Sequence, residues 1–398
     1  MINLLVPQNG FLKDGKVFPF LAPLYLKSFL ESKGVKVVLS EKPVFSEYYG
    51  ITVSTPNRFE AQEIIKQIRG LEKTQKAKVV VGGPHITSYY PYTDVNADFY
   101  VQGDGQYPLE QIVKGGKRTL QKSILSAEEW SQLPRPDRSS SDALEYLNRF
   151  KYELDGCKAT TMLVATGCCG KCSFCSEADS KVRWSSVERV SDELFDIVNA
   201  GFKAVYVFDD LFAISVPSVK KYGVLFAKNG LKYRCNAQAN FFTRNGEEMA
   251  KTLKNTGCVE IGVGFESGSQ RILDLVGKGT TVEQNLQTVQ IARKHGLKIK
   301  GFILIGLPWE DWYSLQETER FIQDSGLTNF QVAVYYPFKG TKIRKDMETN
   351  PISAGLAFKE GLGAYAQNGI ADCVVSTPFL TSEQLAEFKT HLENKYKK

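Results

Sequence analysis

The first 118 residues alternate short apolar runs with stretches of helical spacing. Apolar runs that predict strands occur at residues 2–6, 35–39, 49–54, 78–81 and 98–101. Between them, apolar positions three and four residues apart predict helices at residues 23–32, 59–71 and 107–113. Strands separated by helices form right-handed βαβ units around a parallel sheet. We therefore expect residues 1–118 to form a Rossmann-like α/β domain that binds ligands at the carboxyl ends of its strands.

The same alternation resumes after a segment with neither periodicity. Residues 119–156 contain Leu133-Pro134-Arg135-Pro136-Asp137 and then a run of serines, which cannot make a helix or a central strand and predict a linker. Further strands are expected at residues 161–166, 204–208, 232–236, 259–263, 299–305 and 330–335, with helices such as 187–199 and 282–295 between them. Six successive βα units predict a closed or partly closed parallel barrel over residues 157–345. Residues 346–398 predict a small helical C-terminal region, whose last helix has its N-cap at Thr381 or Ser382.

Composition adds little to this picture. Of the 398 residues, 42% are hydrophobic and 24% are charged, as in a globular protein with a sizeable core. The net charge of +6 is spread along the chain and does not favour a nucleic-acid partner. No window approaches the ~18 apolar residues of a membrane helix, and the N-terminal residues predict a strand rather than a signal peptide. We expect a cytoplasmic protein without a membrane partner.

Four of the eight cysteines crowd into the segment Thr166-Gly167-Cys168-Cys169-Gly170-Lys171-Cys172-Ser173-Phe174-Cys175, after the first barrel strand. Cys168, Cys172 and Cys175 have the spacing C-x3-C-x2-C. Iron–sulfur clusters usually take four thiolates, so three would leave one iron open for a substrate or cofactor. Zinc and free buried cysteines are the alternatives. A structural zinc site needs four ligands, and no fourth ligand follows at finger spacing.

This cysteine segment, with an aromatic residue before its last cysteine, resembles the radical S-adenosylmethionine (SAM) superfamily. Four further segments are similar to the core of that family in type and order: Phe208-Asp209-Asp210-Leu211-Phe212, Gly264-Phe265-Glu266-Ser267-Gly268-Ser269, Gly301-Phe302-Ile303-Leu304-Ile305-Gly306-Leu307-Pro308 and Tyr336-Pro337-Phe338-Lys339-Gly340-Thr341. The resemblance covers about residues 157–345 and implies a partial (β/α)6 radical SAM barrel.

The resemblance implies that the three cysteines bind three irons of a [4Fe–4S] cluster and that SAM chelates the fourth. Reductive cleavage of SAM would then give a 5′-deoxyadenosyl radical, which abstracts hydrogen from the substrate, while the protein supplies orientation and excludes water. The family also implies two kinds of partner. One is a small-molecule or peptide substrate, and the other is an electron donor such as flavodoxin or ferredoxin.

Roles for five residues around SAM follow from the same resemblance. Asp209 or Asp210 stands where the family holds the methionyl amine, although the family often has Gly-Gly-Glu there. Glu266 and Ser267 stand where contacts to the ribose and the carboxylate are usual. Phe174 is expected to pack near the adenine.

The first domain resembles the cobalamin-binding domain that precedes many radical SAM enzymes. The similar segments are residues 20–26, 52–55, 81–87 and 101–107, of which Val81-Gly82-Gly83-Pro84-His85-Ile86-Thr87 is the most specific. Small residues let the backbone approach a large ligand. The expected cobalamin contacts are Thr52, Ser54, Gly82, Gly83, Pro84, Gly103 and Gly105.

The chain contains no Asp-x-His-x-x-Gly string, with which other cobalamin enzymes ligate cobalt through histidine. His85 follows Gly83-Pro84 and is interpreted as a loop or packing histidine. Cobalamin would therefore bind without histidine on the lower face of cobalt. The alternative is that this domain has lost cobalamin and acts only as a scaffold.

The resemblance favours a cobalamin-dependent methyltransferase that acts on an unactivated centre. A cobalamin-associated radical SAM enzyme that catalyses a rearrangement, a cyclisation or another non-methylating reaction would use the same parts. A metal-binding regulatory protein without turnover is a third class. A methylthiotransferase is less favoured, because no cysteine before Cys157 could bind a second cluster.

Overall fold

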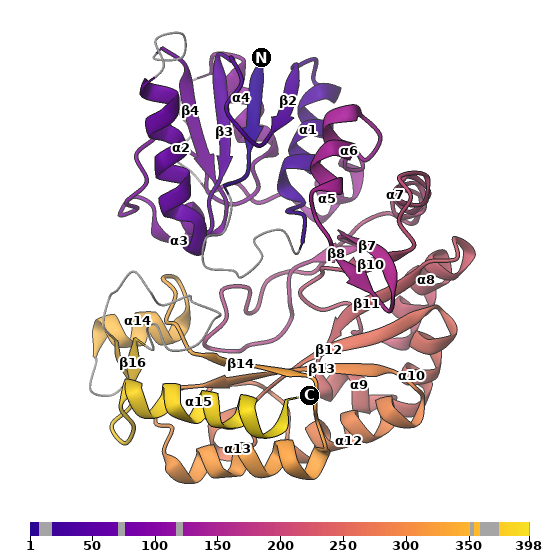
Figure 1. Ribbon diagram of the computed structural model, residues 1–398, viewed down its shortest axis with the longest axis vertical. Helices are drawn as coiled ribbons and strands as arrows, with labels where there is room; N and C mark the ends of the chain where they lie inside the picture. The colour runs from indigo at the N-terminus through magenta and orange to yellow at the C-terminus, as the bar shows by residue number, and fades with distance from the viewer. Residues whose placement is uncertain (8–17, 71–75, 117–121, 351–353, 359–373, 398) are drawn as a thin grey trace. The chain divides into compact units, whose positions relative to one another are not determined.

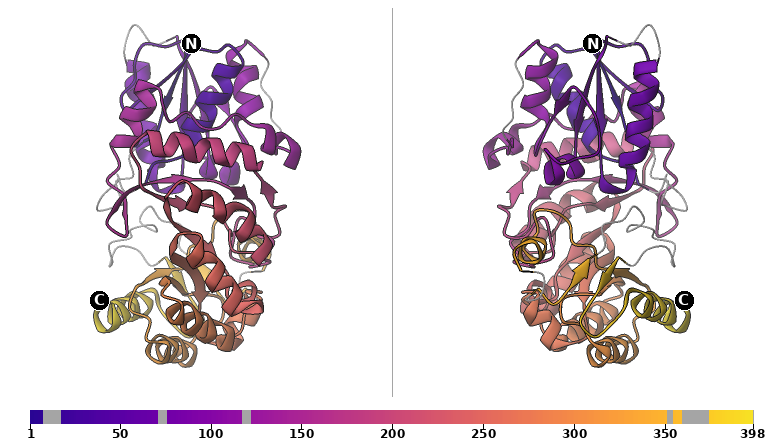
Figure 2. Two further views of the ribbon diagram at one scale, coloured as in Figure 1. Left: turned by 90° about the vertical axis from the view of Figure 1, so that its right-hand side faces the viewer. Right: turned by 90° about the vertical axis from the view of Figure 1, so that its left-hand side faces the viewer.

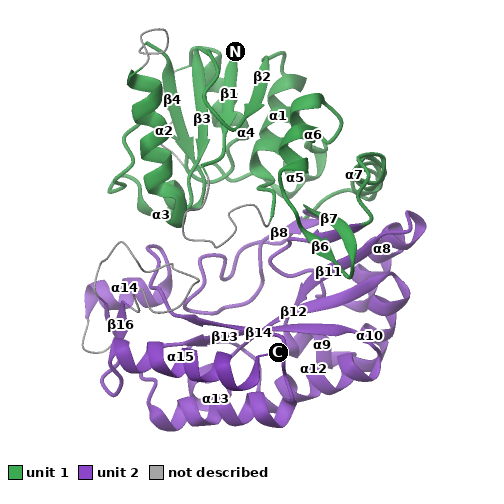
Figure 3. Ribbon diagram, in the orientation of Figure 1, with its two compact units in different colours: residues 1–161, 184–203 green, residues 162–183, 204–398 purple. Residues whose placement is uncertain are grey.

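The computed structural model describes residues 1–7, 18–70, 76–116, 122–350, 354–358 and 374–397. The chain divides into two compact units, which Figure 3 colours separately. Unit 1 comprises residues 1–161 and 184–203, and unit 2 comprises residues 162–183 and 204–398. The chain therefore enters unit 2, returns to unit 1 for one segment, and enters unit 2 again. Among the described residues, no helix is both long enough and apolar enough to cross a membrane.

Unit 1 contains a five-stranded parallel sheet in the order β2-β1-β3-β4-β5. The strands are β1 (Ile2–Leu5), β2 (Val37–Ser40), β3 (Tyr48–Thr52), β4 (Lys78–Gly82) and β5 (Phe99–Tyr100). They alternate with α1 (Ala22–Ser32), η1 (Thr55–Asn57), α2 (Arg58–Gly70), α3 (Pro84–Tyr89) and α4 (Gln106–Val113) (Figure 1). The strand order reverses between β1 and β3, which makes their carboxyl ends the expected ligand position. The predicted Rossmann-like sheet is confirmed.

The core beside this sheet is built by apolar side chains from two neighbouring strands and one helix. Ile51 of β3 and Val79 and Val81 of β4 are buried together with Ile65 and Ile68 of α2. The two isoleucines are three residues apart and therefore lie on the same face of α2. This face covers the sheet, as the spacing of the sequence predicts.

The segment predicted to be a linker belongs to unit 1 and contains α5 (Ala127–Gln132), α6 (Ser141–Asn148) and β6 (Glu153–Leu154). Leu133 to Asp137 form no helix, as expected. The prediction that the serine run also forms none was wrong, because Ser140 is the N-cap of α6 and Ser141 begins that helix. Serine favours the N-cap position, and the buried Tyr146 and Leu147 give the short helix an apolar face.

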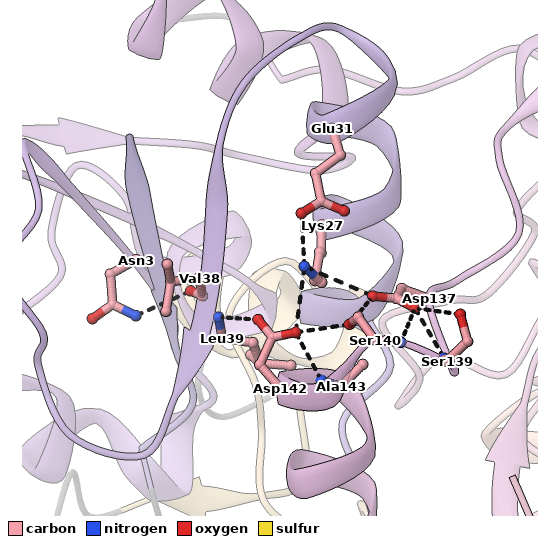
Figure 4. A network of polar contacts seen from close by, with 10 residues as sticks. All are labelled: Asn3, Lys27, Glu31, Val38, Leu39, Asp137, Ser139, Ser140, Asp142 and Ala143. Atoms are coloured by element: carbon pink, nitrogen blue, oxygen red, sulfur yellow. Dashed lines mark hydrogen bonds and ion pairs between the residues drawn. The ribbon is translucent and has the colours of Figure 1, made fainter.

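A buried lysine ties this segment to the sheet of unit 1 (Figure 4). Lys27 of α1 is 4% exposed, and its Nζ lies 2.7 Å from a Glu31 carboxylate oxygen, 3.5 Å from Asp142 Oδ1 and 3.7 Å from Asp137 Oδ2. The other Asp142 oxygen accepts a hydrogen bond from the Leu39 N–H of β2 at 3.0 Å. Because a buried ammonium needs anionic partners, these contacts favour one position of α6 against α1 and β2.

A second buried ion pair holds α7 (Val187–Asn199) within unit 1. Arg138 and Glu193 are each 1% exposed, and Arg138 Nη2 donates to Glu193 Oε1 and to the Thr161 carbonyl oxygen, both at 2.7 Å. α7 was predicted with the same bounds. Its partner in the predicted linker could not be read from sequence spacing, because 55 residues separate the two charges.

A seven-stranded sheet in the order β14-β13-β12-β11-β10-β7-β6 forms the partial barrel. Its long strands are β7 (Cys157–Met162), β10 (Ala204–Val207), β11 (Lys232–Ala237), β12 (Cys258–Glu266), β13 (Lys298–Ile305) and β14 (Phe330–Val334). Neighbouring strands from β10 to β14 are parallel, and the unit boundary falls within β7. The sheet ends at β14 on one side and at β6 on the other. The barrel is therefore partial rather than closed, which confirms the expected fold class.

Helices cover one face of these strands (Figures 1 and 2). Among them are α8 (Val216–Lys228), α9 (Ala239–Arg244), α10 (Gly246–Asn255), α12 (Val282–Lys294), α13 (Trp312–Ser325) and α15 (Ser382–Tyr396). Unit 2 also contains α11 (Gln270–Leu275) and α14 (Lys342–Thr349). α12 packs on β13, and α15 packs on β14. Thr381 Oγ1 accepts from the Gln384 N–H at 3.3 Å, which confirms Thr381 as the predicted N-cap.

Side chains alternate across the strands of unit 2. Ile261, Val263 and Ile303 are fully buried, whereas Lys300 and Phe302 on the opposite face keep partial exposure. Two short strand pairs follow: β8 (Ala165–Thr166) with β9 (Arg183–Trp184), where the unit boundary falls within β9, and β15 (Ala357–Phe358) with β16 (Val375–Ser376). The C-terminal region thus holds a short antiparallel strand pair as well as helices. Cys373, the last of the eight cysteines in the sequence, lies outside the described residues.

Candidate functional site

The chain turns at Gly167, the residue directly after β8. Gly167 has φ +89°, and a Cβ at this position would overlap the Lys181 carbonyl oxygen, so glycine is required. The Gly167 N–H donates to Asp210 Oδ2 at 2.9 Å. This turn starts the cysteine loop (residues 167–180), which the sequence predicts at the carboxyl end of the first barrel strand.

Hydrogen bonds close the cysteine loop and reach its sulfur atoms. The Cys168 N–H donates to Ser180 Oγ at 2.8 Å, and the Ser180 N–H donates to the Cys168 carbonyl oxygen at 2.9 Å. The Gly170 N–H donates to Cys168 Sγ at 3.4 Å, and the Glu177 N–H donates to Cys175 Sγ at 3.3 Å. Donors that face a sulfur favour the thiolate over the thiol. The backbone of the loop is therefore arranged for anionic sulfur.

Burial acts against ionisation of the same thiols. It raises the pKa of Cys168 and of Cys172, and it raises the pKa of Cys175 to about 11. At neutral pH the three thiols therefore lose their protons only when a cation compensates for burial. Cys169 is exposed, whereas Cys172 is buried, which sets the extra cysteine apart from the three with ligand spacing.

Within the described ranges, no three histidine, cysteine, aspartate or glutamate side chains converge on a position for one metal ion. A four-iron cluster does not require such convergence, because each thiolate binds a different iron. The three cysteines fit a cluster through their donor type, their spacing and their place on one closed loop.

The two predicted aspartates follow β10 and contact the backbone that leads into the cysteine loop. Asp209 is buried, and its Oδ1 accepts from the Val164 N–H at 2.8 Å. The Asn236 side-chain amide donates to the Asp209 carbonyl oxygen at 2.9 Å. Asp210, which accepts from Gly167, is exposed. The structure thus brings Asp210 to the first residue of the cysteine loop and Asp209 to the backbone just before it, and of the two only Asp210 is exposed.

Glu266 ends β12 in an unusual backbone conformation. Its φ is +62°, and the register between β12 and β13 shifts between Gly264 and Glu266. Such an irregularity re-aims a side chain. The Glu266 Oε1 atom accepts a hydrogen bond from Lys278 Nζ at 2.7 Å. The next residue, Ser267, is fully buried, and its hydroxyl lies 3.1 Å from Thr318 Oγ1.

Lys278 is a site residue that the sequence interpretation missed. Its side chain is 9% exposed, and its Nζ lies 6.0 Å from the ring centroid of Phe174, inside the cysteine loop. Burial lowers the pKa of Lys278, but the charge and the hydrogen bond of Glu266, together with the neighbouring cysteine sulfurs, outweigh burial, so that the pKa is raised. The only signal in the sequence is the Gly277-Lys278-Gly279 string.

In unit 1, the predicted cobalamin contacts lie at the carboxyl ends of β3, β4 and β5. Thr52 and Gly82 are the last residues of β3 and β4 and are paired in register. Ser54 is the N-cap of η1, Gly105 is the N-cap of α4, and Pro84 begins α3. The structure therefore brings these five residues to one edge of the sheet, as the sequence predicts.

The remaining two glycines make close contacts with the protein's own backbone. Gly83 has φ +104°, and a Cβ there would lie 2.7 Å from the Val53 carbonyl oxygen. Gly103 has φ +78°, and a Cβ there would overlap the Ser123 carbonyl oxygen. Packing within unit 1 therefore explains these two glycines without a ligand.

His85 packs inside unit 1. Its ring stacks on Tyr89 with centroids 4.6 Å apart, Nδ1 lies 3.3 Å from Thr55 Oγ1 and Nε2 lies 3.1 Å from Thr93 Oγ1. Nε2 also lies 3.4 Å from a carboxylate oxygen of Asp94. Burial lowers the pKa of His85. Both ring nitrogens have partners in the protein, in agreement with the interpretation as a packing histidine.

The segment that carries this site matches a known family. Residues 162–322 match the sequence profile of the Radical SAM superfamily. The chain has a radical SAM domain. This match confirms the resemblance inferred from the cysteine segment for residues 162–322, and the protein is an enzyme. The radical SAM domain includes the cysteine loop and the Glu266–Lys278 pair.

Two relatives extend over most of the chain. An uncharacterized methyltransferase of Pyrococcus horikoshii is 28% identical over 379 residues, which cover 86% of this chain and 82% of that protein. A protein of Methanocaldococcus jannaschii named as a methylthiotransferase is 25% identical over 360 residues, or 84% of this chain and 76% of that protein.

Two solved structures share the fold of the radical SAM domain together with unit 1. The methyltransferase TsrM from Kitasatospora setae, with cobalamin and a [4Fe–4S] cluster bound, matches with a TM-score of 0.72 and 19% identity, over 90% of this chain and 78% of that one. The radical enzyme OxsB, with aqua-cobalamin and S-adenosylmethionine bound, matches with a TM-score of 0.66 and 19% identity, over 89% of this chain and 56% of that one.

Proposed function

We propose that Cys168, Cys172 and Cys175 bind three irons of a [4Fe–4S] cluster and that SAM binds the remaining iron. The observation that carries this proposal is the cysteine loop, which holds thiols of ligand spacing, backbone donors to two sulfurs and a buried lysine beside them. When bound there, the cluster would supply the electron that cleaves SAM to a 5′-deoxyadenosyl radical.

The five residues predicted for SAM divide into two groups in this proposal. Glu266, Asp210 and Phe174 keep enough exposure to contact SAM directly. Asp209 and Ser267 are 1% and 0% exposed, so they act by holding the backbone. Asp209 holds the strand that leads into the cysteine loop, and Ser267 holds the turn after Glu266.

We propose further that unit 1 binds cobalamin and that the enzyme transfers a methyl group to an unactivated centre. Three observations support this. The strand order gives a switch point at β1 and β3. Both nitrogens of His85 have partners in the protein, as expected if cobalt has no histidine ligand. The relatives with this fold include methyltransferases, one of them with cobalamin bound.

Radical SAM enzymes take small-molecule substrates and need a reductant. In this chain we propose a small molecule or a peptide as substrate and flavodoxin or ferredoxin as electron donor.

Purification without oxygen, followed by a visible spectrum and product analysis, tests the proposal. We expect about four irons per chain, retained corrinoid after addition of hydroxocobalamin, and 5′-deoxyadenosine when a reductant and SAM are added. With SAM that carries an isotope-labelled methyl group, the product should gain the mass of one labelled methyl.

A methylthio group in the product would instead favour the activity named for the relative from Methanocaldococcus jannaschii. A product with the same mass as the substrate would contradict methyl transfer, but it would still agree with a radical rearrangement. Stoichiometric zinc without iron would contradict the whole proposal.

A further inference from the structure

Lys278 places a buried positive charge beside the cysteine loop. Its side chain is 9% exposed, and its Nζ lies 6.0 Å from the ring centroid of Phe174, the residue before Cys175. By contrast, Lys171 lies within the same loop, between two cysteines, but is exposed to solvent. Solvent screens an exposed charge, whereas a buried one acts at nearly full strength on its neighbours.

The segment that carries Lys278 is held by two hydrogen bonds from the cysteine loop and by a third from Gln238, which follows β11. The Ser173 N–H and hydroxyl both donate to the Val276 carbonyl oxygen, at 2.9 and 3.1 Å. The Gln238 side-chain amide donates to the Lys278 carbonyl oxygen at 2.8 Å. Between them, a Cβ at Gly277 would lie 3.2 Å from the Lys171 carbonyl oxygen. The backbone that carries the ammonium is therefore fixed against the cysteine loop.

Glu266 supplies the counter-charge, and Gly264 makes room for both groups. A Cβ at Gly264 would overlap the Glu266 carboxylate and lie 2.9 Å from Lys278 Nζ. Lys278 Nζ lies 6.0 Å from the ring centroid of Phe174, which stands between Cys172 and Cys175 in the sequence, and it donates to Glu266 Oε1 at 2.7 Å. The cation therefore contacts the cysteine loop, and the carboxylate offsets part of its charge.

We propose that Lys278 is a positioning residue that raises the reduction potential of the cluster bound by the three cysteines, and that Glu266 lowers it. The proposal rests on the proposed cluster and adds to it. Reduction brings one more negative charge to the site, so a fixed positive charge nearby stabilises the reduced cluster and a fixed negative charge destabilises it. The two partners of one ion pair should then move the potential in opposite directions.

The test is a redox titration of the anaerobically reconstituted full chain, followed by the electron paramagnetic resonance of the reduced cluster, without SAM. We expect Lys278→Met to weaken reduction about tenfold, which is about 59 mV for one electron. Glu266→Gln should favour reduction, and Lys278→Arg should stay close to the wild type. Lys171→Met, which removes an exposed lysine from the same loop, is the matched control and should shift the potential far less.

The double variant Lys278→Met/Glu266→Gln should have a higher potential than Lys278→Met, because loss of the carboxylate restores part of what loss of the cation removes. Equal shifts in Lys278→Met and Lys171→Met would overturn the proposal, as would shifts of the same sign in Lys278→Met and Glu266→Gln. If Lys278→Met fails to hold a cluster, the direction of the Glu266→Gln shift decides. A wild-type chain that binds no iron would instead contradict the proposed function itself.

Discussion

Both units keep their candidate ligand sites at the carboxyl ends of parallel strands, yet the two sites are built from different material. In unit 2 the site contains acidic and basic side chains with little exposure, with Glu266 paired to Lys278 and Asp209 held to backbone. In unit 1 the corresponding strand ends carry hydroxyls and glycines, and the one histidine there has its ring nitrogens engaged.

The difference shows which surroundings each kind of ligand needs at the ends of parallel strands. A small metal centre gains from charges fixed a few ångströms away, since their effect falls with distance. A large flat ligand gains from backbone that it can approach closely, and side chains would only obstruct it. Parallel strands supply both sites. The residues at the strand ends decide which of the two is built.

The largest expected effect is the loss of iron from unit 2 without the loss of corrinoid from unit 1. In the triple variant Cys168→Ala/Cys172→Ala/Cys175→Ala, iron should fall from about four per chain to none, because no thiolate with ligand spacing remains. Retention of corrinoid by unit 1 should not change. Metal analysis and a visible spectrum measure both, with Cys169→Ala as the control that keeps its iron. Iron retained in the triple variant would place the cluster elsewhere.

A smaller effect tests whether the glycines of unit 1 serve packing. Gly103→Ala should lower the free energy of unfolding by about 2–4 kcal/mol, from left-handed strain and from overlap with a backbone oxygen. Gly115 has a similar φ of +81° but nothing within 4 Å of its would-be Cβ, so Gly115→Ala isolates the strain alone. Urea unfolding measures the two losses. Equal losses in the two variants would show that the close contact at Gly103 is unimportant.

The smallest effect concerns the buried histidine and pH. Burial lowers the pKa of His85 in the folded chain, so the unfolded chain binds a proton first as the pH falls. His85 therefore costs no stability above its unfolded pKa of about 6.5, and destabilises unit 1 by up to about 1.4 kcal/mol per pH unit below it.

Urea unfolding at pH 7.5 and pH 5.5 should show this loss in the wild type and less of it in His85→Gln. A corrinoid spectrum that is the same in wild type and His85→Ala should accompany it. Imidazole coupling that disappears in His85→Ala would mean that this histidine ligates cobalt after all.

Elements with a long periodic pattern could be predicted from the sequence, and contacts that depend on a turn could not. The helix at residues 187–199 has the predicted bounds, and the Thr381 N-cap is where its residue type indicates. The cysteines could be found because their spacing is local. Lys278 could not, because it reaches Glu266 only through a left-handed turn and a register shift across 12 residues.

The segment predicted to be a linker shows another limit of prediction from sequence. Its short helices lack the length that makes periodicity visible, so its prolines and serines dominated the prediction. What holds it in place is the Lys27 network and the Arg138–Glu193 pair, each formed by charges far apart in sequence. Sequence spacing carries no information on such pairs, and a charged residue that becomes fully buried looks like a surface residue until its partner is known.

The path of the chain has a consequence for exchange of parts between enzymes. Because residues 184–203 return to unit 1, the front unit is not one contiguous stretch of the gene. A fragment that stops before α7 would keep Arg138, which is 1% exposed, but lose the glutamate that neutralises it. An unpaired buried charge costs about 3–5 kcal/mol, a large share of the stability of an ordinary domain. Chimaeras of this chain with its relatives should therefore exchange residues 184–203 together with residues 1–161, as two inserts from the same parent.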